Sequence, residues 1–147
     1  MTVDYGNAEV ETNETNNILV GNAINIIRNV DLVPTVVSTA ASANRGGRIS
    51  IASTVANNGS TVTAAYSQVQ YHLSTSNISN TKNVFLGTSY ISGLAAGGSS
   101  VVSTPVTIPT NLAPRSYYLW MTVDYGNAEI ETNEANNVLV GNAIIIL

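Results

Sequence analysis

The chain has 147 residues, enough for one domain and a short additional segment. Charged residues make up 10% of it, far below the roughly 25% usual in globular domains, and Ser, Thr and Asn take their place. The net charge is −4 and the five basic residues are scattered, which excludes a nucleic-acid-binding footprint and argues against binding to anionic membranes. There is no cysteine, and no apolar run is long enough for a transmembrane helix.

The segment at the start of the chain is repeated at its end. Residues 1–27 read MTVDYGNAEVETNETNNILVGNAINII and residues 121–147 read MTVDYGNAEIETNEANNVLVGNAIIIL, with five differences between them. Eight of the nine carboxylates lie in these two copies. A self-similarity with a period of one domain indicates a tandem array of domains. We therefore expect residues 1–27 to be the C-terminal strands of a preceding repeat, or a donated strand segment, and residues 28–147 to be one whole repeat cut from a longer array.

From residue 28 onward, β-type segments alternate with turn residues at the spacing of a sandwich. The predicted strands are seven and span residues 30–38, 48–56, 66–73, 84–91, 100–108, 117–125 and 138–146. Pro34 and Pro105 lie inside the first and the fifth, which predicts edge strands because proline cannot donate a ladder hydrogen bond. No window has a 3.6-residue apolar period, so no helix is predicted. The pattern predicts an all-β fold, an immunoglobulin-like seven-stranded β-sandwich preceded by the terminal β-hairpin of an adjacent repeat.

The junction between repeats has no flexible spacer. Residues 18–35 read ILVGNAINIIRNVDLVPT, with one glycine and no Gly/Ser run of the kind that makes a loose linker. The last strand of one repeat therefore leads almost directly into the first strand of the next. We predict a stiff connection between repeats.

The repeated segment concentrates carboxylates. A Gly-Asn pair at residues 126–127 predicts a two-residue hairpin turn with glycine at its first central position. This turn would place Asp124 directly opposite Glu129, and like charges in that arrangement are destabilising. Glu131 and Glu134 follow within a few residues. The segment therefore needs either wide solvation or a bound cation.

Two hypotheses account for this acidic, asparagine-rich segment. Carboxylate and amide oxygens in this mixture suit calcium, which takes six to eight oxygen ligands. Alternatively, the Asn and Glu side chains hydrogen-bond to nearby backbone and no metal is needed; the spacing is not that of an EF-hand loop. The predicted calcium ligands, or a subset of them, are Asp124, Asn127, Glu131, Asn133, Glu134 and Asn137, with Asp4, Asn7, Glu11, Asn13, Glu14 and Asn17 in the first copy.

The remaining candidates favour no enzyme. His72, the single histidine, has the polar-face parity of its strand, so a surface residue is predicted rather than a catalytic base. A serine triad needs a nucleophile, a base and an acid that converge, and nothing in the sequence indicates this. A pair of glycosidase carboxylates on a short hairpin would lack a cleft. Trp120 and Tyr118 share one strand face, where they either pack or form a platform for a sugar or a partner.

Short motifs along the chain carry a resemblance to a known family. They are Asp31-Leu32, Val55-Ala56-Asn57-Asn58-Gly59, Tyr71-His72-Leu73-Ser74-Thr75, Leu86-Gly87, Ile108-Pro109 with Leu112, Tyr117-Tyr118-Leu119 and, most specifically, Val123-Asp124 through Asn127, Glu131, Asn133-Glu134 and Asn136-Asn137. On these residues the chain resembles CARDB, the cell-adhesion-related domain found in bacteria. The resemblance covers residues 30–140 and part of residues 1–20. In such domains the loop after the third strand often carries aspartates; here it has asparagines, so no second ion site is expected there.

The resemblance implies an immunoglobulin-like sandwich that occurs in tandem on secreted and surface proteins. Together with the composition, it predicts a non-enzymatic structural repeat of an extracellular bacterial or archaeal fibre, stalk or adhesin, assembled as head-to-tail β-sandwich beads with calcium as a candidate stabilising ion. The alternative is a carbohydrate- or protein-binding accessory module of a secreted protein. The expected partners are neighbouring copies of the repeat, covalent or strand-donated, with carbohydrate as a further candidate and without nucleic acid or membrane insertion.

Overall fold

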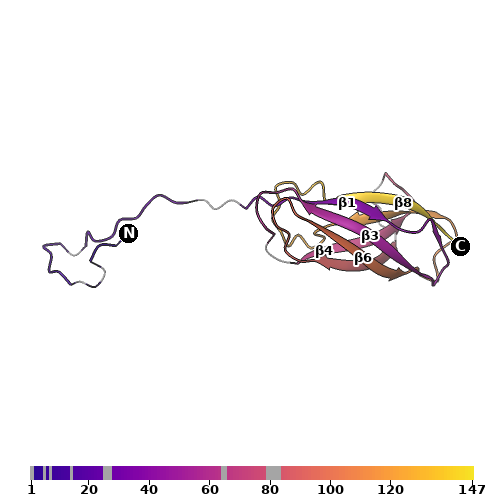
Figure 1. The fold of residues 1–147 in the computed structure, drawn as a ribbon, viewed down its shortest axis with the longest axis horizontal. Coiled ribbons are helices and arrows are strands. Elements are labelled where there is room, and N and C mark those ends of the chain that lie inside the picture. Colours follow the sequence, from indigo (N-terminus) through magenta and orange to yellow (C-terminus); the bar gives the residue numbers. More distant parts are fainter. Residues whose placement is uncertain are drawn as a thin grey trace.

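Two sheets pack face to face in the second part of the chain (Figure 1). The computed structural model describes residues 2–4, 6, 8–13, 15–24, 28–63, 66–78 and 84–147. One sheet has the order β1-β3-β6, with β1 at Leu32–Ser38, β3 at Arg48–Asn57 and β6 at Ser99–Thr107. The other has the order β2-β8-β7-β4-β5, with β2 at Ser42–Ala43, β8 at Val138–Ile146, β7 at Ser116–Thr122, β4 at Ser67–Ser74 and β5 at Val84–Ile91. All neighbouring strands are antiparallel except β2 and β8.

The predicted all-β immunoglobulin-like sandwich is confirmed. Each of the seven predicted strands is present, and β5 and β8 have the predicted bounds. The eighth strand, β2, escaped prediction because two residues carry no alternation to read. Pro34 and Pro105 lie on β1 and β6, the two edges of their sheet, as predicted. The described residues contain no helix, and hence none that could span a membrane.

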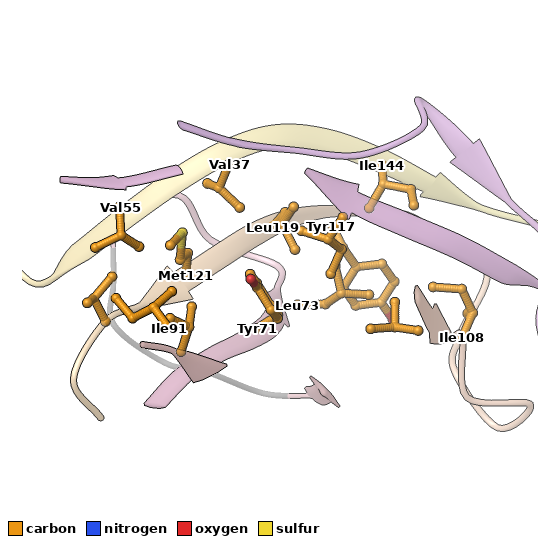
Figure 2. Packing of buried hydrophobic residues seen from close by; sticks show 14 of the residues in the cluster. Val37, Val55, Tyr71, Leu73, Ile91, Ile108, Tyr117, Leu119, Met121 and Ile144 are labelled. Carbon is orange, nitrogen blue, oxygen red and sulfur yellow. The ribbon is translucent and has the colours of Figure 1, made fainter. Parts of the chain in front are cut away.

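The core lies between the sheets and is built from alternate residues of facing strands (Figure 2). Removal of this apolar surface from water is the main stabilising contribution, at about 25 cal/mol per Å². Tyr71 brings a hydroxyl into the core, where it hydrogen-bonds to Ser53 Oγ (2.7 Å) and Ser89 Oγ (2.9 Å). Fully buried members include Leu32, Ile51, Leu73, Leu119, Met121 and Ile144.

The start of β7 is fixed by a tyrosine. The Tyr117 hydroxyl donates to the Ala113 carbonyl (3.1 Å), four residues upstream. A tyrosine bonded back to the preceding corner in this way is a recurrent feature of immunoglobulin-like sandwiches. It joins the start of β7 to the corner that precedes it.

The chain enters and leaves the sandwich at opposite ends (Figure 1). At the N-terminal end, Asn29 O accepts from Thr61 N (3.0 Å), and Asn29 N donates to Thr61 Oγ1 (3.0 Å). At the C-terminal end, Leu147 N donates to Ala43 O (3.0 Å), and Leu147 O accepts from Arg45 N (3.3 Å). The first and last residues of the repeat are therefore held by the body of the sandwich.

Candidate functional site

The second copy of the repeated segment forms the loop between β7 and β8, which we call the acidic loop (residues 123–137). Val123 N donates to Asn137 O (2.8 Å) at its base. The predicted two-residue turn at residues 126–127 is wrong. Positive φ angles occur at Asp124 (45°) and Asn127 (48°), and not at Gly126. β7 and β8 are thus joined by a long loop in place of a tight turn.

Asp124 organises the first part of the acidic loop. Its Oδ1 accepts from Ala128 N (3.2 Å) and its Oδ2 accepts from Glu129 N (3.0 Å). Its carbonyl accepts from Asn127 N (2.9 Å). Asp124 and Glu129 are therefore not a cross-strand pair of like charges. The buried Asp124 carboxylate is compensated by two backbone N–H groups, which is the usual way in which Asp stabilises a tight turn.

Glu129 holds the residue at which the repeat begins. Its side chain is 1% exposed, and its Oε2 lies 3.3 Å from Nη2 of Arg28. The same Arg28 nitrogen donates to the Val62 carbonyl (3.2 Å). A buried carboxylate retains its charge at low cost only when a cation accompanies it. The pair therefore fixes Arg28 against the acidic loop, a role that the sequence reading missed because the two residues are far apart in the chain.

Glu131 holds the start of β1. Its Oε2 accepts from Leu32 N, and its Oε1 accepts from Asn137 Nδ2 (3.1 Å). Its own N–H donates to Glu134 Oε1 (2.9 Å). Burial raises the pKa of Glu131 to about 7, against the opposing effect of the hydrogen bonds from Leu32 and Asn137; the charges of Glu134 and Asp124 raise it further. The carboxyl group thus titrates near neutral pH.

Further hydrogen bonds join the acidic loop to the same short segment. Thr132 N donates to Val30 O (2.8 Å), beside a parallel bridge between Val30 and Glu131. Asn136 Nδ2 donates to Asp31 Oδ1 (2.9 Å). These contacts all join the acidic loop to residues 28–32. They tie the β7–β8 connection to the first strand of the other sheet.

The predicted calcium ligands of the acidic loop are placed in three groups. Asp124 and Asn127 lie in the first turn. Asn133 Oδ1 accepts from Ala135 N (3.1 Å). Glu131 contacts both Glu134 and Asn137. Within the described part of the chain, no three His, Asp or Glu side chains gather as metal ligands. Each oxygen of Asp124 and of Glu131 accepts one N–H donor. The calcium site stays a prediction.

The first copy repeats the local structure of the acidic loop. Asp4 has φ 48°, and its oxygens accept from Ala8 N (2.8 Å) and Glu9 N (3.2 Å). Asn13 Oδ1 accepts from Thr15 N (3.0 Å). These contacts match those of the second copy although the described part of the first copy lies outside the sandwich (Figure 1). Of the predicted ligands in this copy, Glu11 and Asn17 are also described, whereas Asn7 and Glu14 lie outside the described residues.

Two further residues differ from expectation. His72 was predicted at the surface, which is wrong: it is 8% exposed because the rings of Phe85 (centroids 5.5 Å apart) and Tyr125 (6.4 Å) lie against it. Trp120 is 6% exposed, and its indole N–H donates to the Ser76 carbonyl (3.0 Å). Trp120 therefore offers no open stacking platform. No pocket is found over the described residues.

Solved structures share the fold. The CARDB domain of a Pyrococcus furiosus protein, solved in complex with di-metal ions, matches with a TM-score of 0.61 and 16% identity, covering 83% of this chain and 97% of that one. A domain of a Methanosarcina acetivorans protein, called a "putative cell surface protein", matches with a TM-score of 0.59 and 22% identity, covering 81% and 93%. At these identities the likeness establishes the fold alone.

An enzyme also matches, over a small part of its length. A β-glucosidase from Erythrobacter marinus has a TM-score of 0.54 and 14% identity, and the match covers 80% of this chain but 16% of the enzyme. No curated protein matches the chain. The CARDB family model matches residues 29–141, which is most of the sequence and confirms the resemblance carried by its motifs. The chain belongs to the CARDB family.

Proposed function

We propose that this chain is a structural repeat of an extracellular bacterial or archaeal fibre, stalk or adhesin, in which sandwiches follow one another head to tail. The observation that carries the proposal is the near-identity of residues 1–27 and 121–147. In support, Ile24 is 88% exposed, whereas its counterpart Ile144 is fully buried in the core. A segment that exposes to water a residue whose counterpart lies in a core is expected to complete another sandwich. Residues 1–27 are then the end of the preceding repeat.

The ends of the repeat support an extended array. Leu147 corresponds to Ile27, so in an array the counterpart of Arg28 follows Leu147 directly. Leu147 is held by its own sandwich and Arg28 by its own acidic loop. Every residue of the joint then contacts one of the two sandwiches. Leu147 and the counterpart of Arg28 are consecutive, so their Cα atoms are about 3.8 Å apart. Such a joint restricts the orientation of one repeat relative to the next.

Gly59 allows the chain to lie close to the sandwich at this joint. A Cβ at this position would lie 2.1 Å from Asn29 O and 2.7 Å from Val30 Cα, well inside any real contact. Only glycine permits so close an approach. The first residues of the repeat are thereby held against the turn after β3, which favours a stiff joint over a flexible tether.

The proposal is tested by adding repeats. The full chain followed by one, two and three further copies of residues 28–147 is measured by small-angle X-ray scattering and electron microscopy. Each copy is expected to add roughly 30–40 Å to the longest dimension, because a strand of about ten residues spans about 33 Å. Particles that thicken without lengthening would contradict the array. Dispersed particles that bind a glycan array would instead support the alternative, an accessory module that binds carbohydrate.

Calcium stabilisation is tested on the same protein. A ligand that binds only the folded form raises the melting temperature as its free concentration rises. We expect the same melting temperature in chelator and in millimolar calcium, because the described carboxylates do not gather in a group of three that could hold a metal ion. A calcium-dependent rise of several degrees that Glu131→Gln removes would establish the ion site and overturn this expectation.

A further inference from the structure

We propose that consecutive repeats meet end to end through opposite charges, with the C-terminal end of one sandwich, lined by arginines, against the acidic N-terminal end of the next. The occupant of each end is a second copy of this sandwich. The inference rests on the proposed array and goes beyond it, because it assigns the surface through which neighbouring repeats contact each other.

Charge is segregated along the sandwich. Arg45, Arg48 and Arg115 lie at its C-terminal end, where no described residue carries a carboxylate side chain. Of the other cations of residues 28–147, Arg28 pairs with Glu129, and Lys82 lies outside the described residues. Every carboxylate of residues 28–147 lies at the opposite, N-terminal end; these are Asp31, Asp124, Glu129, Glu131 and Glu134.

The position of the three arginines follows from the strand order. Arg45 N and Nε each donate to the Leu147 carbonyl (3.3 Å), at the end of β8. The carbonyl of Arg115 accepts from Ile146 N (3.0 Å) at the start of β7. Arg48 opens β3 beside the end of β6. All three side chains are exposed, and none forms an ion pair with an Asp or Glu side chain in the described ranges.

The acidic end offers accessible charge in return. Glu134 is exposed and Asp31 is half-buried, so both can meet a cation from outside, while the buried Asp124 adds to the negative potential behind them. Glu129 is compensated within its own sandwich by Arg28. A single accessible pair contributes little, and a cluster of three cations facing several carboxylates is the arrangement in which surface charges act together.

Chain continuity supplies the proximity that such charges need. Charges more than a Debye length apart, about 8 Å at physiological salt, are largely screened. In the array, Leu147 and the counterpart of Arg28 are consecutive, so the two ends cannot separate. The contact joins two different surfaces, and a heterologous contact of this kind propagates into an open chain of repeats.

The experiment measures how tightly the charges fix neighbouring repeats. The protein is the full chain followed by one further copy of residues 28–147. Because the chain has no cysteine, Val101→Cys in each of the two sandwiches gives two spin-label sites. Val101 is suitable because it is 79% exposed on edge strand β6. Double electron–electron resonance then gives the distance distribution. We expect it to broaden about twofold between 20 mM and 1 M NaCl, where the Debye length falls to about 3 Å.

A matched pair of variants separates the joint from general charge effects. Arg48→Glu with Arg115→Glu in the first of the two sandwiches reverses the charge at the joint. The same two substitutions in the second sandwich reverse the charge at the free end and give a protein of identical composition. The first variant is expected to show the broad distribution already at 20 mM NaCl, and the second the narrow one. Equal melting temperatures confirm that both fold alike.

Each outcome decides the inference. The charged contact is overturned if the width of the distance distribution does not depend on salt, or if it is the same in both variants. In that case a mean distance of one repeat length still supports the array. A mean distance far shorter than one repeat length contradicts the head-to-tail array itself. Broadening of the first variant alone, together with the salt effect, establishes the contact.

Discussion

At the residue scale, the duplicated segment presents the same side chains in two surroundings. Asp4 and Asp124 form the same turn, with φ angles of 48° and 45° and the same two backbone donors, although only Asp124 lies in a sandwich. The turn is therefore specified by a few consecutive residues. Glu131 differs, because its contact with Leu32 joins residues 99 positions apart and requires the folded sandwich.

Asp124→Ala is expected to lower the free energy of unfolding by about 2–3 kcal/mol, because two amides lose their acceptor and alanine resists a positive φ. Urea unfolding can follow the fluorescence of Trp120, the single tryptophan, which is buried. Asp4→Ala is the control and should leave the transition unchanged, since the Asp4 side chain accepts from Ala8 N and Glu9 N within the first copy. Equal effects of the two substitutions would contradict a role of Asp124 in holding the acidic loop.

Glu131 makes stability depend on pH. Its folded pKa of about 7 lies above the unfolded value of 4.5. Between these values the folded protein keeps a proton that the unfolded chain has lost, so the contribution of Glu131 to stability is fully present below about pH 4.5 and is lost as pH rises to about 7. The expected loss is about 1–3 kcal/mol, allowing for partial solvation. Unfolding free energies at pH 5 and pH 8 in chelator measure it.

Glu131→Gln should remove most of this pH dependence, because an amide does not titrate and can still accept from Leu32 N. Glu11→Gln, the same substitution in the first copy, should keep it. Any slope that remains in the Glu131 variant comes from other titratable groups of the chain. An undiminished slope in that variant would show that Glu131 is not its source.

At the element scale, the strands were predictable and their mutual contacts were not. Proline correctly placed β1 and β6 at sheet edges because its missing N–H has the same consequence in any sheet. The contact between β1 and β8, which lie in different sheets, has no such local signal. It depends on Asn142, whose Oδ1 accepts from Thr39 N (2.9 Å) and whose Nδ2 donates to Thr39 O (3.2 Å), and on the glycine beside it.

Gly141 lets β1 approach β8. A Cβ there would lie 2.4 Å from Val37 O, so Gly141→Ala must displace one strand and should cost about 1–3 kcal/mol, as overpacking does. Gly21 occupies the same place in the first copy, where a Cβ would meet nothing within 4 Å. Gly21→Ala should therefore leave the thermal transition where it is. A destabilisation shared by both variants would rule out the close approach as the cause.

At the scale of the whole molecule, the sandwich carries the cooperative structure. None of the backbone hydrogen bonds described joins residues 2–24 to residues 28–147. Residues 28–147 alone are therefore expected to melt within about 2 °C of the full chain, because loss of residues that share none of these hydrogen bonds with the sandwich leaves the unfolding free energy nearly unchanged. Scanning calorimetry of the two proteins measures this. A fall of many degrees would show that the first copy contributes to the sandwich, as a donated strand would.

The sequence by itself determined the fold class, seven of the eight strands, the two edge strands that contain proline, and the duplicated segment, because alternation, proline and self-similarity can be recognised in the sequence alone. It also located the segment that forms the acidic loop. Only the tertiary structure decided what that segment does. The contacts of Glu129 with Arg28 and of Glu131 with Leu32 depend on how β1, β7 and β8 are brought together. The burial of His72 on β4 depends on the ring of Phe85 on β5, and the sequence does not predict which strands are neighbours. Contacts between residues a hundred positions apart leave no local pattern in a single sequence.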